Sequence, residues 1–131
     1  MSPIVGFEDK DFLRGKIVLP AWYTMRIEEI TEKPSADGNS TNYPVEGTIL
    51  KNAEDGNEEF AGVPIYWNFN SKAKGFMIGF LHALGVEPKP GQRVDLTAAV
   101  GSVIDVFVEN KTYEGRILNS VNHKYRATKQ Q

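Results

Sequence analysis

The chain has 131 residues with no cysteine, and its 15 lysines and arginines against 17 aspartates and glutamates give a net charge of −2. This length predicts a single domain with one core. The absence of cysteine excludes disulfides, cysteine-ligated zinc and thiol nucleophiles, and two histidines leave little material for a histidine-rich metal site. No apolar run approaches the roughly 20 residues of a membrane span, and the first residues lack the pattern of a signal peptide. We therefore expect an intracellular protein without membrane contact.

Charge is distributed unevenly along the chain. Residues 28–59 hold nine acids and two lysines, whereas residues 60–131 hold nine lysines and arginines and five acids. Five of these cations lie in residues 111–131, against one acid. A slightly acidic total does not exclude a polyanionic partner, because the local field at the contact surface governs binding. The alternative is that both groups of charges are simply solvated surface.

The first half of the chain predicts an arm and three strands. Residues 1–15 have no periodic pattern and predict an extended arm. Residues 22–28 alternate between apolar and polar positions, which is typical of a half-buried strand. Two more alternating runs, 41–50 and 62–69, each follow a segment rich in Pro, Gly, Asp or Asn, the residues that form turns.

One helix is expected next, over residues 70–85. Its apolar side chains recur at helical spacing, with Ser71 as the expected N-cap and Gly85 as the expected stop. We expect the apolar stripe of this helix to lie in the core, and His82 beside it to be structural. The stripe consists of Phe76, Phe80 and Leu84.

Residues 93–121 predict a short strand and then a hairpin with its turn at Asn110 and Lys111. The order is then three strands, one helix, and two or three strands. This order is typical of a mainly β, five-stranded barrel of the OB (oligonucleotide/oligosaccharide-binding) type, with one helix between strands three and four; such barrels bind ligands across strands two and three. The expected parts are an extended arm over 1–15, an OB-like barrel over 16–123 and a basic C-terminal tail over 124–131.

Three segments carry a resemblance to a known family. They are an early strand with a Gly/Asn-rich turn (22–40), a helix ending in LHALGV, and the strand pair YEGRILNSV, in which a Tyr-x-Gly turn precedes an Asn-x-Val strand. Residues 15–126 thus resemble a family of small bacteriophage single-stranded DNA-binding proteins. The resemblance implies an OB fold, binding of single strands with little sequence preference, and a role in phage DNA replication or recombination in the host cytoplasm. The chain departs from many replicative single-strand binders by ending in KYRATKQQ instead of an acidic, partner-recruiting tail.

Binding single strands of any sequence needs cations for the phosphates and exposed rings on which bases stack. Alternation places Trp67 inward and Tyr66 outward, and puts Trp22 on the outward side of its strand with Arg26. The expected nucleic-acid-binding residues are Trp22, Arg26, Lys51, Tyr66, Lys72, Lys74, Lys111, Tyr113, Arg116, Lys124, Tyr125 and Arg126. The alternatives are structural: a loop or oligomer contact over Trp22 and Tyr66, hairpin packing for Tyr113, and a disordered tail for Tyr125.

No catalytic motif is present. The sequence has no Gly-rich phosphate loop, nucleophile elbow or HExxH motif, and Glu28 and Glu29 face opposite ways on a strand. The acidic segment 52–59 does not match the spacing of an EF-hand loop, and we expect a solvated hairpin tip that repels polyanions. We expect no catalytic residue, no metal ligand and no cofactor.

We therefore expect a non-catalytic protein that binds single-stranded DNA. Binding of RNA, a homo-oligomer, and partnership with replication or recombination proteins are open possibilities. The alternative from another class is a β-barrel phage structural or adaptor protein whose exposed rings bind a protein, and a third is an oligosaccharide-binding barrel. Salt dependence separates the first two, because only phosphate contacts make affinity fall steeply as salt rises.

Overall fold

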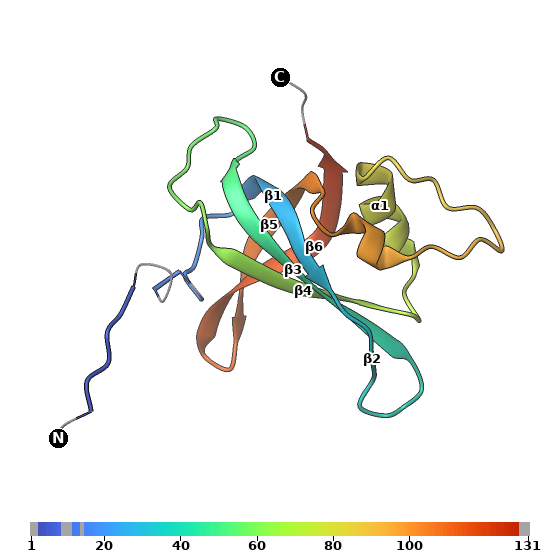
Figure 1. Ribbon diagram of the computed structural model, residues 1–131, viewed down its shortest axis with the longest axis horizontal. Coiled ribbons are helices and arrows are strands. Elements are labelled where there is room, and N and C mark those ends of the chain that lie inside the picture. Colours follow the sequence, from blue (N-terminus) through green and yellow to red (C-terminus); the bar gives the residue numbers. More distant parts are fainter. Residues whose placement is uncertain (1–2, 9–11, 14, 129–131) are drawn as a thin grey trace.

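The computed structural model describes residues 3–8, 12–13 and 15–128. Figure 1 shows a β-sheet with a single α-helix at one end. The strands are β1 (Ala21–Ile30), β2 (Lys33–Pro34), β3 (Thr41–Asn52), β4 (Pro64–Asn70), β5 (Val103–Tyr113) and β6 (Arg116–Ala127); the helices are α1 (Gly75–Ala83) and a short 3-10 helix, η2 (Leu96–Ala99). None of the helices within the described ranges has the length and apolar composition that a membrane crossing needs.

The six strands form one antiparallel sheet. Its order is β2-β3-β1-β5-β6. Strands β1 and β2 pair with successive parts of one edge of β3, and β4 pairs with the opposite edge of β3. The mainly β class is therefore confirmed. The expected five-stranded barrel is not observed, because the sheet has six strands and, among the described residues, does not close between its edges β4 and β6. The extra strand, β2, has two residues and pairs with the start of β3.

Alternation decides which side of each strand is buried. In β1, Tyr23, Met25 and Ile27 are all buried. In β4, Trp67 is 8% exposed whereas its neighbour Tyr66 is 48% exposed. The inward and outward positions that the sequence predicts for these two rings are therefore confirmed.

Helix α1 is shorter than predicted and buries less of its apolar stripe. It starts after Lys74 without a side-chain cap, so the expected N-cap at Ser71 is wrong; the hydroxyl of Ser71 accepts a hydrogen bond from the backbone N–H of Thr41 at 2.9 Å. Phe80 is buried, but Phe76 is 51% exposed, so its predicted core position is wrong. Gly85 ends the helix as expected: its φ is 84°, and its N–H donates to the carbonyl of His82.

The closing hairpin turns later than the sequence analysis expects. Strands β5 and β6 are joined at Glu114 and Gly115, which have φ of 50° and 75°. A two-residue turn with positive φ at both positions matches the twist of the strands. Asn110 and Lys111, the expected turn, pair with β6 inside the ladder instead. Residues 124–127, expected in a basic tail, continue β6.

The ring of Tyr125 links the two edges of the sheet to the helix. It packs against Trp67 and Phe69 of β4, with ring centroids 6.3 and 6.0 Å away, and against Phe80 of α1 at 5.4 Å. Burial raises the pKa of the Tyr125 hydroxyl, and the Trp67 indole opposes this shift. Contacts between aromatic side chains thus connect β4 to β6 where the backbone ladder is missing.

Next to this ring, His123 covers the exposed end of the helix. Its backbone has φ of 54°, at the point where the register between β5 and β6 shifts. The imidazole stacks on Phe76 with centroids 4.3 Å apart, and its Nδ1 lies 2.9 Å from the Tyr125 hydroxyl. Burial lowers the pKa of His123 below its ordinary value of 6.5.

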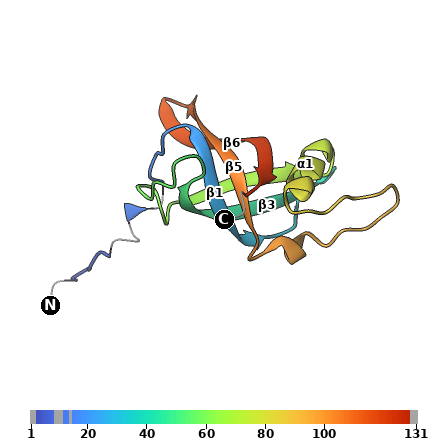
Figure 2. The ribbon, with the colours of Figure 1, turned by 90° about the horizontal axis from the view of Figure 1, so that it is seen from above.

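The N-terminal segment is anchored to the sheet at several points before it leaves it: Leu13 packs against the core, and Lys16 Nζ lies 5.5 Å from the centre of the Phe60 ring. The side-chain carbonyl of Asn119 in β6 accepts from the N–H of Val18, and its amide donates to the carbonyl of Lys16. Residues 3–8 lie away from the body, at the end opposite α1 (Figures 1 and 2). Four large apolar side chains on the N-terminal segment are each more than two-thirds exposed: Ile4, Val5, Phe7 and Phe12.

We predict that His123 makes the protein less stable in mild acid. The unfolded chain takes up a proton near pH 6.5, which the partly buried imidazole resists, so the stabilisation is present above about pH 6.5 and is lost as pH falls below it. Chemical unfolding of the wild type should therefore give a free energy that falls between about pH 7.5 and pH 5.5.

The matched variants are His123→Asn, which accepts a positive φ, and His82→Gln, which removes the exposed histidine of α1. His123→Asn should flatten the pH dependence, and His82→Gln should keep it. The same pH dependence in wild type and His123→Asn would show that His123 does not cause it.

Candidate nucleic-acid interface

A row of polar side chains crosses four strands on one face of the sheet. Thr24 of β1 lies directly opposite Lys51 of β3 on one side and Asp105 of β5 on the other. Asp105 in turn lies opposite Arg126 of β6. Because directly paired residues of neighbouring strands point to the same face, the row Lys51, Thr24, Asp105 and Arg126 shares one surface.

Asp105 is the buried centre of this row. Its side chain is 1% exposed; Oδ1 accepts a hydrogen bond from the Thr24 hydroxyl at 2.8 Å, and Oδ2 accepts one from Arg126 Nε at 3.2 Å. A buried carboxylate without partners is strongly destabilising. Asp105 therefore fixes where the guanidinium of Arg126 lies.

Two aromatic rings lie next to this row. Trp22 and Phe107 are direct partners across β1 and β5, with ring centroids 5.5 Å apart and planes at 73°. The guanidinium carbon of Arg126 lies 4.2 Å from the centre of the Trp22 ring, and Lys124 Nζ lies 5.2 Å from the centre of Phe107. Both distances are within the range of cation–π attraction. We call the surface formed by Trp22, Lys51, Phe107, Lys124 and Arg126 the Trp22 face.

The structure thus brings together four of the expected binding residues, Trp22, Lys51, Lys124 and Arg126. Arg26 lies further along β1, opposite Val103 of β5, and forms an exposed ion pair with Glu28 at 2.6 Å. Arg26 therefore extends the outward row of β1 that starts at Trp22.

The remaining expected residues lie elsewhere. Tyr66 is on β4 opposite Glu46, and Lys72 and Lys74 precede α1. The exposed tip of the β5–β6 hairpin carries Lys111, Tyr113 and Arg116. The ring of Tyr125 packs among Trp67, Phe69 and Phe80, on the core side of β6, and so lies outside the Trp22 face.

Phe107 and Asp105 are absent from the residues that the sequence predicts. The sequence does hold a signal for Phe107, because Ile104, Val106 and Val108 form an alternating apolar run and the residues between them point to the other face. No such signal exists for Asp105. Alternation places its side chain on the outward face of the strand, but it does not predict that other side chains cover it there. Its burial depends on Arg126, which is distant in sequence.

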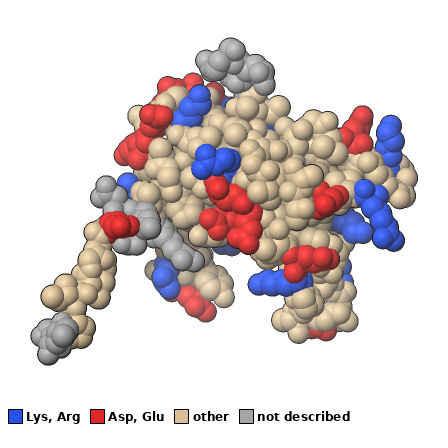
Figure 3. Space-filling model, in the orientation of Figure 1, with Lys and Arg blue, Asp and Glu red and all other residues tan. Residues whose placement is uncertain are grey.

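The acidic loop between β3 and β4 borders the Trp22 face. Glu54 Oε1 of this loop lies 2.6 Å from Arg126 Nη2, and the backbone N–H of Ala53 donates to the carbonyl of Trp22 at 2.9 Å. Figure 3 shows acidic side chains over this loop at the upper left, and mixed acidic and basic side chains over the rest of the view. The positive charge of the Trp22 face is therefore partly balanced by neighbouring carboxylates.

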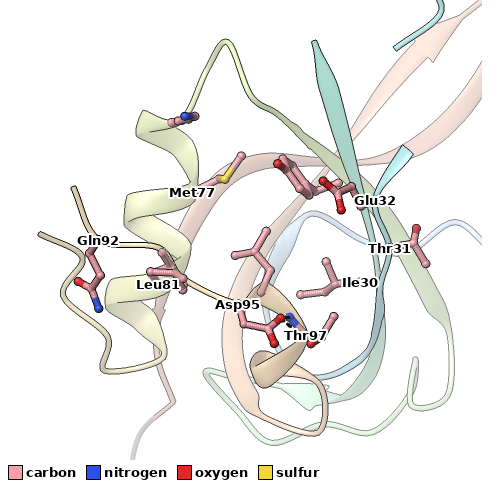
Figure 4. Close-up of a pocket in the computed structure, with 12 residues that line it drawn as sticks. Ile30, Thr31, Glu32, Met77, Leu81, Gln92, Asp95 and Thr97 are labelled. Carbon is pink, nitrogen blue, oxygen red and sulfur yellow. Dashed lines mark hydrogen bonds between the residues drawn. The ribbon is translucent and has the colours of Figure 1, made fainter. Parts of the chain in front are cut away.

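A separate pocket of about 390 Å³ lies against α1. Figure 4 shows Met77 and Leu81 of the helix facing Ile30 and the segment that carries Asp95 and Thr97. Asp95 accepts hydrogen bonds from the backbone N–H and hydroxyl of Thr97, and these bonds lower the pKa of Asp95. No residue of the Trp22 face lines this pocket.

Within residues 3–8, 12–13 and 15–128, no three histidine, aspartate or glutamate side chains gather closely enough to hold a metal ion. A comparison of the sequence with models of known protein families and with curated proteins finds no match.

Proposed function

We propose that the protein is a non-catalytic single-stranded DNA-binding protein and that the Trp22 face binds the strand. The observation that carries this proposal is the pair of neighbouring rings, Trp22 and Phe107, each with a cation over it at 4.2 and 5.2 Å. Rings accept bases of any sequence, and cations beside them hold the phosphates. This combination supports binding without sequence preference.

The energetics favour an unpaired strand over a duplex. Stacking of a base on an aromatic side chain contributes about 1–3 kcal/mol per base, and base pairing in a duplex hides the faces that stacking needs. Trp22 and Phe107 are both half-buried, so each presents part of its ring while the rest packs against the sheet.

For the fold, we infer an open variant of the OB-like barrel. Without the two-residue β2, the order is three strands, α1 and two strands, and the rings of Trp67, Phe69 and Tyr125 bridge the two edges. The family resemblance of residues 15–126 adds the biological setting: phage DNA replication or recombination in the host cytoplasm, with homo-oligomers or replication proteins as further partners.

A second candidate function is that of a phage structural or adaptor protein. The N-terminal segment favours it, because Ile4 is 93% exposed and three further large apolar side chains on that segment are more than two-thirds exposed. Exposed apolar patches of this kind are typical of protein–protein contact sites.

The first test is a titration of labelled oligothymidine, and of a duplex of the same length, with the protein at two salt concentrations. We expect tighter binding of the single strand. With Lys51, Lys124 and Arg126 at phosphates, its affinity should fall by about tenfold or more between about 50 and 200 mM salt. Equal affinity for single strand and duplex, or no binding of either, would contradict the proposal, and salt-insensitive binding of a protein partner would favour the adaptor.

The second test compares the half-buried ring of Trp22 with the exposed ring of Tyr66. Trp22→Ala should weaken binding of oligothymidine by about tenfold, because a stacked base loses its platform, whereas Tyr66→Ala should change it less than about twofold, since Tyr66 lies outside the Trp22 face. Trp22→Leu, which keeps apolar contact with Phe107, should weaken binding similarly, and thermal melting verifies that each variant folds. A larger loss in Tyr66→Ala than in either Trp22 variant would move the site to β4.

A further inference from the structure

The loop between β3 and β4 holds a carboxylate against the Trp22 face. Glu54 Oε1 lies 2.6 Å from Arg126 Nη2, and Arg126 itself lies over the ring of Trp22. Guanidinium groups bind carboxylates and phosphates in the same way, through paired N–H donors. Glu54 therefore occupies a side of Arg126 that a phosphate of a bound strand would use.

Local hydrogen bonds hold Glu54 in this place. The side-chain carbonyl of Asn52 accepts from the backbone N–H groups of Glu54 and Asp55, at 2.8 and 3.2 Å. The next residue after Asn52, Ala53, donates its N–H to the carbonyl of Trp22. The loop is thus tied to the strand that carries the central ring.

The two carboxylates bound to Arg126 differ in how easily they can be displaced. Asp105 is 1% exposed and also accepts from Thr24, so it stays paired with Arg126. The Glu54 side chain is mostly exposed, and exposed ion pairs are weak and sensitive to salt. Of the two carboxylates, Glu54 is the one that a phosphate from solution can reach.

We propose that Glu54 is a built-in competitor of the DNA phosphates: it occupies Arg126 in the free protein and is displaced when a single strand binds. This inference rests on the proposed function of the Trp22 face. Three more acids on the same loop, Asp55, Glu58 and Glu59, repel polyanions approaching from that side. A strand that brings several phosphates at once overcomes this competition, whereas a single phosphate does not.

The test compares Glu54→Gln with Glu58→Gln, which removes the same charge from an exposed acid of the same loop outside the Arg126 pair. Binding of labelled oligothymidine is measured by fluorescence anisotropy at low salt. Both variants lose a repulsive charge, but only Glu54→Gln removes the competitor. Glu54→Gln should bind about two- to fivefold more tightly than the wild type, a gain in affinity that corresponds to the free energy of one exposed ion pair. The gain in Glu58→Gln should be clearly smaller.

A double-mutant comparison locates the effect at Arg126. In the Arg126→Gln background the extra gain from Glu54→Gln should disappear, and thermal melting verifies that this background folds. If Arg126→Gln does not fold, the Glu54→Gln and Glu58→Gln proteins decide alone. Equal affinities in wild type and Glu54→Gln, or equal gains in the two loop variants, would overturn the competition. Failure of all the proteins to bind oligothymidine would overturn the proposed function and this inference with it.

Discussion

The buried carboxylate of Asp105 is the constraint on which the outer face of the sheet depends. It is 1% exposed although it lies on the side of β5 away from the core, and a carboxylate in that position needs partners. Thr24 of β1 and Arg126 of β6 supply them at 2.8 and 3.2 Å. The same contacts join three strands side to side and place the Arg126 guanidinium 4.2 Å from the ring centre of Trp22. The position of Arg126 on the proposed binding surface is thus a consequence of neutralising one buried charge.

Strand β6 also stabilises the opposite face, through the residue next to Arg126. Tyr125 points to the core side and packs against β4 and α1, while Lys124 and Arg126 lie over the rings of Phe107 and Trp22. Because side chains alternate along a strand, one short segment both connects the open edges of the sheet and supplies cations to its outer surface. Disorder in the last residues of β6 would therefore affect the core and the Trp22 face together.

Much of this architecture follows from local patterns, and the rest depends on distant contacts. Alternation predicts the inward Trp67 and outward Tyr66, and it could have identified Phe107. Alternation does not predict that residues 124–127 form a strand, because β6 continues past a register shift at His123, a non-glycine residue with positive φ. Ser71 is not the helix cap because α1 starts only at Gly75, and its hydroxyl instead accepts from Thr41, thirty residues away. The burial of Asp105 likewise needs a partner from the end of the chain.

The most direct measurement uses the two tryptophans, which lie on opposite sides of the sheet: Trp22 on the outer face and Trp67 in the core. Their indole N–H signals can be followed separately by nuclear magnetic resonance in ¹⁵N-labelled protein as oligothymidine is added. If bases stack on the Trp22 face, the Trp22 signal shifts in proportion to the bound fraction and the Trp67 signal stays in place. Saturable binding that leaves the Trp22 signal unchanged would contradict the assignment of this surface.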